Sequence, residues 1–569
     1  MSNSPPPVAK RPSILGLVTP YWRSVDRWKA LALLAVILTI SFTTIYAHIA
    51  LNDVHGKTTD ALIKLNWAAI QPLLLLTFGY GLVTVLLPIT STIFQDYLKL
   101  RWRTWVTRGL IEQWTSGLAY YKFERDNLLS NADQRIAEDT REFVDSSLTL
   151  FINVVSVVVS VASYTTVLWS LSGTLGFTAY GMDFAIPGYM VFAAYLYSIA
   201  HLAVTHWLGK QLIGLNNHKQ TVEADFRFTG MQLRENAEQI AFYKGGVREG
   251  DRLQSRFTRV RENMLQILVR TFKVMFGQSM FSHVFSLLPT LLALPLLLQG
   301  KITYGDMIKL IGAYMMLTNS LSFFQQAYQH FTQWMAWTNR LRDLHWTFNK
   351  AEAQPTHISV TQSETMALSC RQLTLQSPMH QSLATLKDWQ VNAGERWLIR
   401  GASGCGKSTL LRACAGLWPY GVGAIELPSG AHSIFLPQKS YIPAGSLKAA
   451  LCYPAEPDQF TDAQCRQVLI DCRLENRARS LTETDRWQHV LSGGEQQRLA
   501  IGRVLLHRPD FIFLDEATSA LDPATEQHLY QTLIKQLPSS AIISVAHRKS
   551  LEDFHSHHLD LELARSVDA

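Results

Sequence analysis

Cysteine is scarce in this sequence and unevenly distributed. The chain of 569 residues has 6 cysteines, and none of them stands before Cys370. The six are Cys370, Cys405, Cys414, Cys452, Cys465 and Cys472. No two of them have the spacing of a zinc site, and Cys405 falls inside a glycine-rich turn where a disulfide would be hard to accommodate. We therefore expect no disulfide framework and a reduced, cytosolic compartment for this part of the chain.

Other features are missing as well. The sequence has no internal repeat and no low-complexity tract. Its beginning is polar, proline-rich and then basic, without the short apolar core and small-residue cleavage site of a secretion signal, so we expect no cleaved leader. The formal net charge of +7 is small for this length, and we expect no nucleic acid as a partner.

Long apolar runs, in contrast, fill roughly the first 340 residues. Six of them reach the length that spans a bilayer, which is about 20 residues. The six predicted spans are 30–51, 70–94, 148–171, 187–208, 267–298 and 307–331. So many runs of this kind are very unusual in a soluble chain of this length. The sequence therefore predicts a polytopic α-helical membrane domain with six transmembrane helices.

The distribution of basic residues predicts the orientation of the spans. The linkers after the first, third and fifth spans contain only Lys57, Lys64 and Lys301 among Lys and Arg, whereas the stretches after the second and fourth are long and basic. Because positive charge favours the cytoplasmic side, we expect both termini and both long stretches in the cytoplasm. Arg270 and Lys273 then lie at the cytoplasmic end of the fifth span, where long basic side chains reach the interface.

Polar residues inside the predicted spans are candidates for a transport path, because they are costly in lipid. Packing between helices is the better-supported explanation for each of them. They are His206, Gln278, His283, Gln325 and Gln326.

A phosphate-binding loop is predicted after a short apolar run, 397–399. Residues 401–409 have the pattern G-x-x-x-x-G-K-[ST] and lead into a helix-forming run, which is the context that the pattern requires. Its glycines let backbone N–H groups form an anion-binding nest, and the helix adds its positive end. Lys407 is expected to reach the β- and γ-phosphates, and the Ser408 hydroxyl to bind Mg²⁺.

Two carboxylates follow a second apolar run, Phe511–Leu514, which is typical of a buried parallel strand. Asp515 and Glu516 therefore stand at the carboxyl end of a strand, where ligands bind in open α/β sheets. We expect Asp515 to assist Mg²⁺ binding. Glu516 is expected to orient and deprotonate the attacking water.

The segment 491–498, Leu-Ser-Gly-Gly-Glu-Gln-Gln-Arg, resembles the signature of ATP-binding-cassette (ABC) proteins. Gln438 resembles the glutamine loop of that family, and His547 resembles its switch histidine. The segment 519–522, which ends in Asp522, follows the signature as in that family, and all these elements occur in the order of the family. The resemblance implies an α/β P-loop NTPase domain of ABC type with ATP and Mg²⁺. The implied catalytic residues are Lys407, Glu516 and His547, and the implied metal ligands are Ser408, Gln438 and Asp515. The implied nucleotide-binding residues are Gly401, Ala402, Ser403, Gly404, Cys405, Gly406, Lys407, Ser408, Thr409, Ser492, Gly493, Gly494, Glu495 and Asp522.

One departure from the family concerns adenine. ABC domains usually carry an aromatic residue ahead of the phosphate loop, and Ser377 stands at the matching position. Stacking of a base on an aromatic ring contributes about 1–3 kcal/mol in nucleic-acid binders, so we expect modest ATP affinity. Trp397 and Tyr420 are the candidates to stack on adenine in place of the missing aromatic residue.

Segments of the membrane half indicate which branch of the ABC family the chain resembles. Segments 131–139 and 223–243, with 100–105, resemble the SbmA/BacA/YddA-like group, and 415–421 resembles the related peroxisomal ABC subfamily D. The resemblance implies a half-transporter with an exporter-like helix arrangement that acts as a homodimer, because each ATP is enclosed by the phosphate loop of one copy and the signature of the other.

The predicted domains are a cytoplasmic lead over 1–28, a transmembrane domain over 29–348, a linker over 349–365 and the nucleotide-binding domain over 366–569. The resemblance further implies a bacterial inner-membrane protein that takes up peptides or bulky hydrophilic solutes similar to cobalamin. An exporter or translocator of lipids, acyl-CoA or drugs is the alternative, and an ABC ATPase without transport is a remote one.

Overall fold

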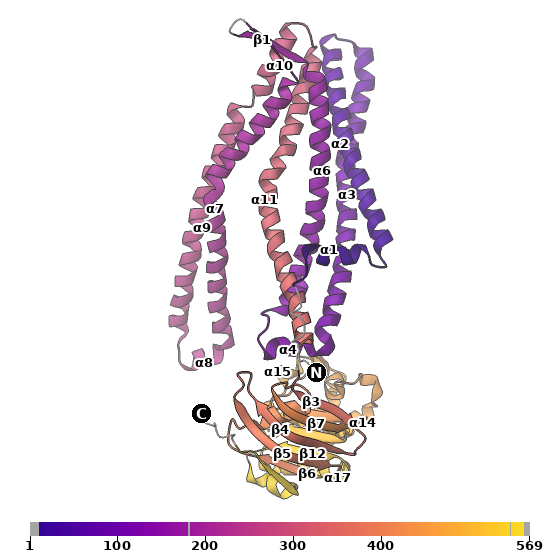
Figure 1. Ribbon diagram of the computed structural model, residues 1–569, viewed down its shortest axis with the longest axis vertical. Helices are drawn as coiled ribbons and strands as arrows, with labels where there is room; N and C mark the ends of the chain where they lie inside the picture. The colour runs from indigo at the N-terminus through magenta and orange to yellow at the C-terminus, as the bar shows by residue number, and fades with distance from the viewer. Residues whose placement is uncertain (1–10, 180–181, 355, 547, 563–569) are drawn as a thin grey trace, which may run out of the picture. The chain divides into compact units, whose positions relative to one another are not determined.

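The computed structural model describes residues 11–179, 182–354, 356–546 and 548–562. The chain folds into two compact units, which divide between Glu352 and Ala353. This division falls within the predicted linker. Figure 1 shows the helices of the first unit and the layered strands and helices of the second.

The first unit is built from long helices joined by short connections. Its main elements are α1 (Ile14–Trp22), α2 (Arg27–Ile63), α3 (Trp67–Thr115), α4 (Ala119–Arg125), α5 (Ala132–Gln134), α6 (Thr140–Ser172), α7 (Tyr189–Glu235), α8 (Ala237–Phe242), α9 (Gly246–Val284), α10 (Leu288–Leu298) and α11 (Tyr304–Glu352). At 1.5 Å per residue, several of these helices are far longer than a bilayer is thick.

Five helical stretches among the described residues are long and apolar enough to cross a membrane. They are 27–63, 67–125, 132–172, 189–235 and 246–298. Four of them contain a whole predicted span, and 189–235 contains all of the fourth predicted span, 187–208, except its first two residues. The sixth predicted span, 307–331, lies within the continuous helix α11. The number of six spans remains a prediction.

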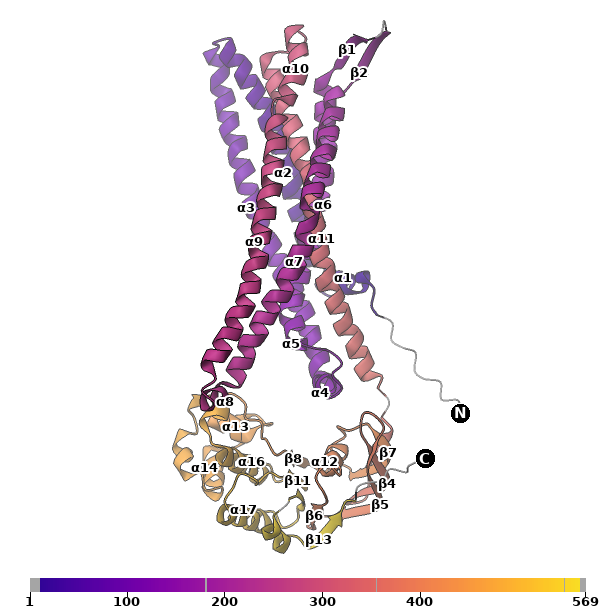
Figure 2. The same ribbon diagram turned by 90° about the vertical axis from the view of Figure 1, so that its left-hand side faces the viewer.

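The helices of the first unit form a main bundle and a side arm. In the bundle α2 packs on α3, and α11 packs on α6 and α2. The arm consists of α7 and α9, which pack along each other and are joined through α8. Both views show the α8 end of this arm lying apart from α3, α6 and α11 (Figures 1 and 2).

Two predictions about this unit need refinement. The fifth predicted span, 267–298, is not one helix: α9 ends at Val284 and α10 begins at Leu288. Pro289 stands in the first turn of α10, where its missing N–H costs nothing, but the same residue could not continue α9 without losing a backbone hydrogen bond. The linker between the third and fourth predicted spans, 172–186, is not irregular: an antiparallel hairpin of β1 (Thr174–Ala179) and β2 (Met182–Pro187) begins within it and ends at Pro187.

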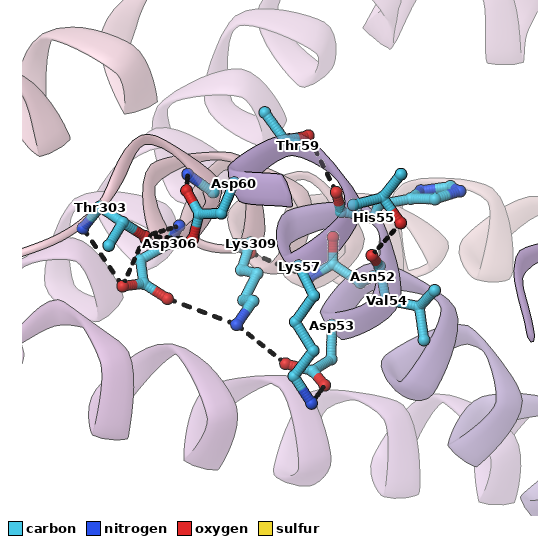
Figure 3. A network of polar contacts seen from close by, with 12 residues as sticks. Asn52, Asp53, Val54, His55, Lys57, Thr59, Asp60, Thr303, Asp306 and Lys309 are labelled. Carbon is cyan, nitrogen blue, oxygen red and sulfur yellow. Dashed lines mark hydrogen bonds and ion pairs between the residues drawn. The ribbon is translucent and has the colours of Figure 1, made fainter. Parts of the chain in front are cut away.

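A polar network fastens the end of α2 to the start of α11 (Figure 3). The Asp60 carboxylate accepts hydrogen bonds from the Gly305 N–H and the Thr303 hydroxyl, both at 2.7 Å. The Lys309 ammonium forms an ion pair with Asp53 at 2.9 Å. Hydrogen bonds to charged groups contribute more than neutral ones, so this network fixes the register between the two helices.

Glycine permits the close approach of these two helices. A β-carbon at Gly305 would collide with the Gly56 carbonyl oxygen and the Asp60 carboxyl group. A β-carbon at Gly56 would lie 2.5 Å from two carbon atoms of the Lys309 side chain. The backbones can therefore touch only because both positions lack a side chain.

The second unit contains two larger sheets. The first is parallel throughout and has the order β13-β6-β12-β11-β8. The second has the order β3-β7-β4-β5. The strands are β3 (Ile358–Ser363), β4 (Ala367–Gln376), β5 (Ser382–Asn392), β6 (Arg396–Arg400), β7 (Gly421–Pro428), β8 (Ser433–Leu436), β11 (Phe511–Asp515), β12 (Ala541–Val545) and β13 (His557–Asp560).

Two hydrophobic cores hold this unit together. One lies between the two sheets and surrounds α12 (Lys407–Cys414). The other lies among α13 (Leu447–Cys452), α14 (Asp462–Asp471), α16 (Gly493–His507) and α17 (Pro523–Gln536). The fully buried strands β11 and β12 contribute to both cores, as expected of strands that are covered on both faces.

We predict that Gly305→Ala destabilises the first unit. The added methyl group would force the contact with Gly56 apart, and such overpacking typically costs about 1–3 kcal/mol. The matched control is Gly81→Ala on α3, where a β-carbon meets no atom within 4 Å. Thermal unfolding of the purified full-length protein should show a lower midpoint for Gly305→Ala only. Equal midpoints for the two variants would contradict the close packing.

Candidate functional site

The predicted phosphate loop connects β6 to α12. Gly401, Gly404 and Gly406 have φ values of 147°, 83° and 97°, a region of backbone conformation that favours glycine. A β-carbon at Gly401 would also lie 2.5 Å from the Leu561 carbonyl oxygen and 2.7 Å from the Cys405 sulfur. The loop therefore turns tightly into the N-terminus of α12, where N–H groups and the helix dipole favour an anion.

Two side chains of α12 are already oriented at this loop. The Lys407 ammonium is buried and donates hydrogen bonds to the carbonyl oxygens of Gly401 and Ala402 at 2.8 and 2.9 Å. The Ser408 hydroxyl donates to Asp515 Oδ1 at 2.9 Å. A hydroxyl and a carboxylate oxygen side by side are the ligand types that Mg²⁺ prefers, so this pair fits the predicted metal.

The glutamine loop and the predicted base also meet. The Gln438 side-chain amide donates to Glu516 Oε2 at 3.0 Å. Glu516 has φ of 49°, an unusual value for a residue that is not glycine. Its own N–H donates to the Val545 carbonyl at 3.0 Å, which holds it at the end of β12.

The sheet order explains why these residues converge. Neighbouring parallel strands end at the same edge, and the phosphate loop follows β6, Asp515 and Glu516 stand at the end of β11, and Gln438 follows β8. His547 follows β12, but it lies outside the described residues. Residues that are far apart in the sequence therefore come within hydrogen-bonding distance. Ser408 and Asp515, for example, are 107 positions apart.

The signature segment caps a helix. Ser492 is the N-cap of α16, and it forms a capping box with Glu495: each backbone N–H is bound by the other residue's side chain. Burial alone would raise the pKa of the Glu495 carboxyl, but hydrogen bonds from the Ser492 N–H and from Arg477 outweigh burial and lower that pKa. In the described part of the chain, no hydrogen bond or ion pair joins residues 492–495 to the phosphate loop.

Asp522 plays a comparable part at the next helix. It is the N-cap of α17, and its carboxylate accepts the Thr525 N–H at 3.0 Å. Hydrogen bonds from Thr525 lower the pKa of this carboxyl. The cap fixes where the segment 519–522 turns, and therefore which of its atoms face outward.

Gln497 is an important residue that the sequence analysis missed. Its side-chain amide lies in the buried face of α16, donates to the Ser519 hydroxyl at 3.2 Å and to the Gln438 carbonyl at 3.4 Å, and accepts the Ala520 N–H at 2.9 Å. One amide therefore ties the signature helix to the glutamine loop and to the segment 519–522. Its place within the signature segment 491–498, about one helical turn after Gly493, was the available signal.

Two arginines were also missed. Arg548 donates to the carbonyl oxygens of Leu521 and Ser519 at 2.8 and 3.0 Å. Arg503 donates from buried α16 to the carbonyls of Ala450 and Tyr441, and burial lowers the pKa of its guanidinium to about 10. Arg503 thus remains charged near neutral pH and links α16 to the segment after Gln438.

Ser377 orders a tight turn between β4 and β5. Its hydroxyl accepts the N–H groups of Met379 and Gln381, both at 3.2 Å. Of the two aromatic candidates, Trp397 stacks on His557 of β13, whereas the Tyr420 carbonyl accepts the N–H of Gln376, the residue next to Ser377. The Tyr420 backbone therefore lies next to the turn formed by Ser377, and its ring packs edge-on against Trp418.

Comparison with known proteins identifies this arrangement. The family description "ABC transporter transmembrane region 2" matches residues 16–298, and "ABC transporter" matches residues 386–519. The inner membrane ABC transporter ATP-binding protein YddA of Escherichia coli is 30% identical over 94% of this chain and 94% of its own length. The chain belongs to the ABC transporter family.

Two further likenesses bear on this ABC transporter. The chloroplastic ABC transporter D family member 2 of Arabidopsis thaliana is 28% identical over 96% of this chain and 85% of that protein. The structure of a bacterial Atm1-family ABC exporter with ATP bound superposes with a TM-score of 0.69 and covers 95% of this chain and 96% of that one. Its sequence identity is 19%, so this match shows the fold alone.

These likenesses confirm two predictions made from the sequence. The predicted fold class, a helical membrane domain with an exporter-like arrangement fused to an ABC-type P-loop domain, is confirmed. The resemblance to the YddA-like group and to subfamily D is also confirmed. The chain is a membrane-spanning ABC transporter whose fused ATPase domain couples ATP hydrolysis to transport.

We predict that Gln497→Leu slows ATP hydrolysis by this transporter by at least about tenfold. Leucine of similar size would leave the Ala520 N–H without its partner, and an unsatisfied buried donor costs about 1–3 kcal/mol. The control is Gln467→Leu, because among the described residues the Gln467 amide bonds only to Asp471 within α14. Turnover of the purified full-length protein should fall for Gln497→Leu alone, and unchanged turnover would show that the bridge is dispensable.

Proposed function

We propose that this transporter works as a homodimer in the bacterial inner membrane, with both termini in the cytoplasm, and that it takes up peptides or bulky hydrophilic solutes. Two composite sites hydrolyse ATP with Mg²⁺. The observation that carries the ATP-hydrolysing part of this proposal is the pair of contacts Ser408–Asp515 and Gln438–Glu516, which gather a hydroxyl, a carboxamide and two carboxylates at one sheet edge.

Each residue then has a role that suits its chemistry. Lys407 binds the phosphates and neutralises charge on them, while the loop N–H groups of Gly401–Thr409 hold the same oxygens. Ser408, Asp515 and Gln438 supply the oxygen ligands that Mg²⁺ requires. Glu516 orients a water molecule and accepts its proton, and His547 is the second catalytic group implied by the family.

The homodimer is supported by two features of the single chain. The signature residues Ser492–Glu495 make no polar contact with their own phosphate loop among the described residues, so they are free to serve the site of another copy. The arm of α7–α9 ends in exposed apolar side chains: Phe242 is 78% exposed, Tyr243 86% and Val247 80%. A second copy would cover surfaces of this kind.

The choice of a polar substrate is supported by a cluster within the membrane unit. Tyr197 stacks on His201, and a cavity of about 140 Å³ beside them is lined by further polar side chains, among them Ser198 and Thr318. His201 Nε2 and the Tyr314 hydroxyl are buried, and neither has a hydrogen-bond partner in the described part of the chain. Polar groups in a membrane are costly and mark transport paths.

The other candidates inside the spans divide into three groups. The Gln278 amide donates to the Thr205 hydroxyl at 3.1 Å, which suits packing between α7 and α9. His206 and His283 are exposed on the single chain. The side chains of Gln325 and Gln326 lie outside the described part of the structure.

A translocator of lipids or acyl-CoA is the second candidate. An apolar cavity of about 850 Å³ supports it, because its walls combine Trp22, Trp102 and Phe331 with other apolar residues of α1, α2, α6 and α11. Stimulation of ATP hydrolysis by lipid would favour this function over uptake of hydrophilic solutes.

We predict that Glu516→Gln lowers ATP hydrolysis by about 10²–10⁴-fold, as loss of a general base typically does. ATP binding should persist, because the new amide oxygen can still accept the Gln438 hydrogen bond. Hydrolysis and nucleotide binding of the full-length protein are measured side by side, with exposed Glu483→Gln as the control. Normal hydrolysis by Glu516→Gln would refute the role of the base.

The direction and class of transport are tested in cells. Uptake of a labelled peptide and of labelled cobalamin is compared between cells that carry the wild-type protein and cells that carry Glu516→Gln. The proposal expects accumulation only with the wild type. Equal accumulation of both compounds in the two strains would eliminate the importer and leave the lipid translocator.

A further inference from the structure

An open groove of about 780 Å³ lies between α7 and α9. It falls where the fourth predicted span ends, at 208, and the fifth begins, at 267. Its walls include Lys210, Gln211 and Gly214 of α7 and Gln266, Arg270 and Lys273 of α9. None of these residues belongs to the ATP site or to the polar cluster around His201.

Contacts between the two helices bracket this groove. On one side the Gln278 amide donates to the Thr205 hydroxyl at 3.1 Å. On the other side the buried Asn263 amide donates to the Leu215 carbonyl at 3.2 Å. Because α7 and α9 are held together on both sides, the groove is a fixed feature of the arm.

A glycine provides part of the space. A β-carbon at Gly214 would meet no described atom within 4 Å, and Gly214 lines the groove, so a side chain at this position would take up space in the groove. Glycine also weakens a helix relative to alanine. The residue therefore leaves an opening that the packing of the helices does not require.

The groove carries uncompensated positive charge. No carboxylate forms an ion pair within 4 Å of Lys210, Arg270 or Lys273 among the described residues. The sequence contains no aspartate or glutamate over 189–222 or over 263–284. Arg270 Nε is buried and has no hydrogen-bond partner among the residues that the structure describes, and a buried charged donor without a partner is expensive. The chemistry of the groove thus calls for an anion.

The position of the groove indicates where this anion comes from. The ends of the predicted spans lie at the membrane interface, on the side that the basic loops assign to the cytoplasm. Basic pockets between transmembrane helices on this side bind the headgroups of anionic lipids. Guanidinium and ammonium groups together suit a phosphate oxygen cluster.

We propose that the groove between α7 and α9 binds a phosphate-bearing anion, which in the membrane is the headgroup of an anionic phospholipid. Lys210, Arg270 and Lys273 neutralise the phosphate. The Gln211 and Gln266 amides bind the glycerol oxygens of the lipid headgroup. The site is independent of the transported substrate and of ATP hydrolysis.

Native mass spectrometry of the full-length protein, titrated with phosphatidylglycerol or with phosphatidylcholine, tests this site. The wild type should bind phosphatidylglycerol more tightly. Replacing Lys210, Arg270 and Lys273 together by Gln should weaken that binding on the order of 100-fold, since each cation near a lipid surface contributes about fivefold. Gly214→Leu, which favours the helix, should abolish it by filling the groove.

The control replaces Arg248, Arg259 and Arg261 of α9 by Gln, an equal change of charge at exposed positions outside the groove. This control should bind phosphatidylglycerol like the wild type. Competition by the deacylated headgroup, glycerophosphoglycerol, would show that a free phosphate suffices, and its absence would show that the lipid is required. Equal binding of the two lipids, or wild-type affinity in the groove variants, would overturn the proposal. Glu516→Gln should bind phosphatidylglycerol normally, so failure of the transport proposal and failure of this one are separable.

Discussion

Parallel pairing of β6, β12, β11 and β8 is the constraint on which the ATP site depends. Each strand is held by backbone hydrogen bonds to its neighbour, and all four end at one edge of the sheet. The residues of the ATP site therefore come from segments that are far apart in the sequence: a lysine and a serine after β6, two carboxylates at the end of β11 and a glutamine after β8. A slip of one residue in any pair would turn the wrong side chain toward the site.

The membrane unit obeys a different constraint, which is close contact between helices in a medium without a hydrophobic effect. Where α2 meets α11, Gly56 and Gly305 let the backbones touch and Asp60 binds across the contact. Where α7 meets α9, the helices touch on both sides of a groove and separate within it. The same kind of packing thus produces a closed joint at one place and an open site at the other.

The sequence was sufficient for much of the site because its chemistry is local. The phosphate loop, Asp515 and Glu516 each follow an apolar strand within a few residues, so each could be placed at the site from its own segment, whereas Gln438 and His547 were implied only by the resemblance to the family. Gln497, Arg503 and Arg548 escaped because their partners are backbone atoms or side chains on other elements, and nothing in the residue type distinguishes them from solvated polar residues of a helix or loop. Their hydrogen bonds form only when the chain folds and brings these elements together.

The membrane half was less predictable in detail for a similar reason. Apolar runs identify the long helices, but the break between α9 and α10 depends on the single residue Pro289, and the hairpin over 174–187 on pairing between two short strands. Ser377 stands out in the sequence as a departure from the family. The structure explains this residue, because its hydroxyl accepts two N–H groups in the turn between β4 and β5. The groove lined by Lys210 and Arg270 required both helices to be placed before its charge could be recognised as unpaired.

The amide of Gln497 has a consequence for kinetics. Because one planar group is shared by three segments, a shift of any one of them breaks a hydrogen bond to the others. The three segments cannot relax independently. Spectroscopic probes attached near Gln438, Ser519 and α16 should therefore report a single common rate constant, whichever of the segments is the first to be disturbed.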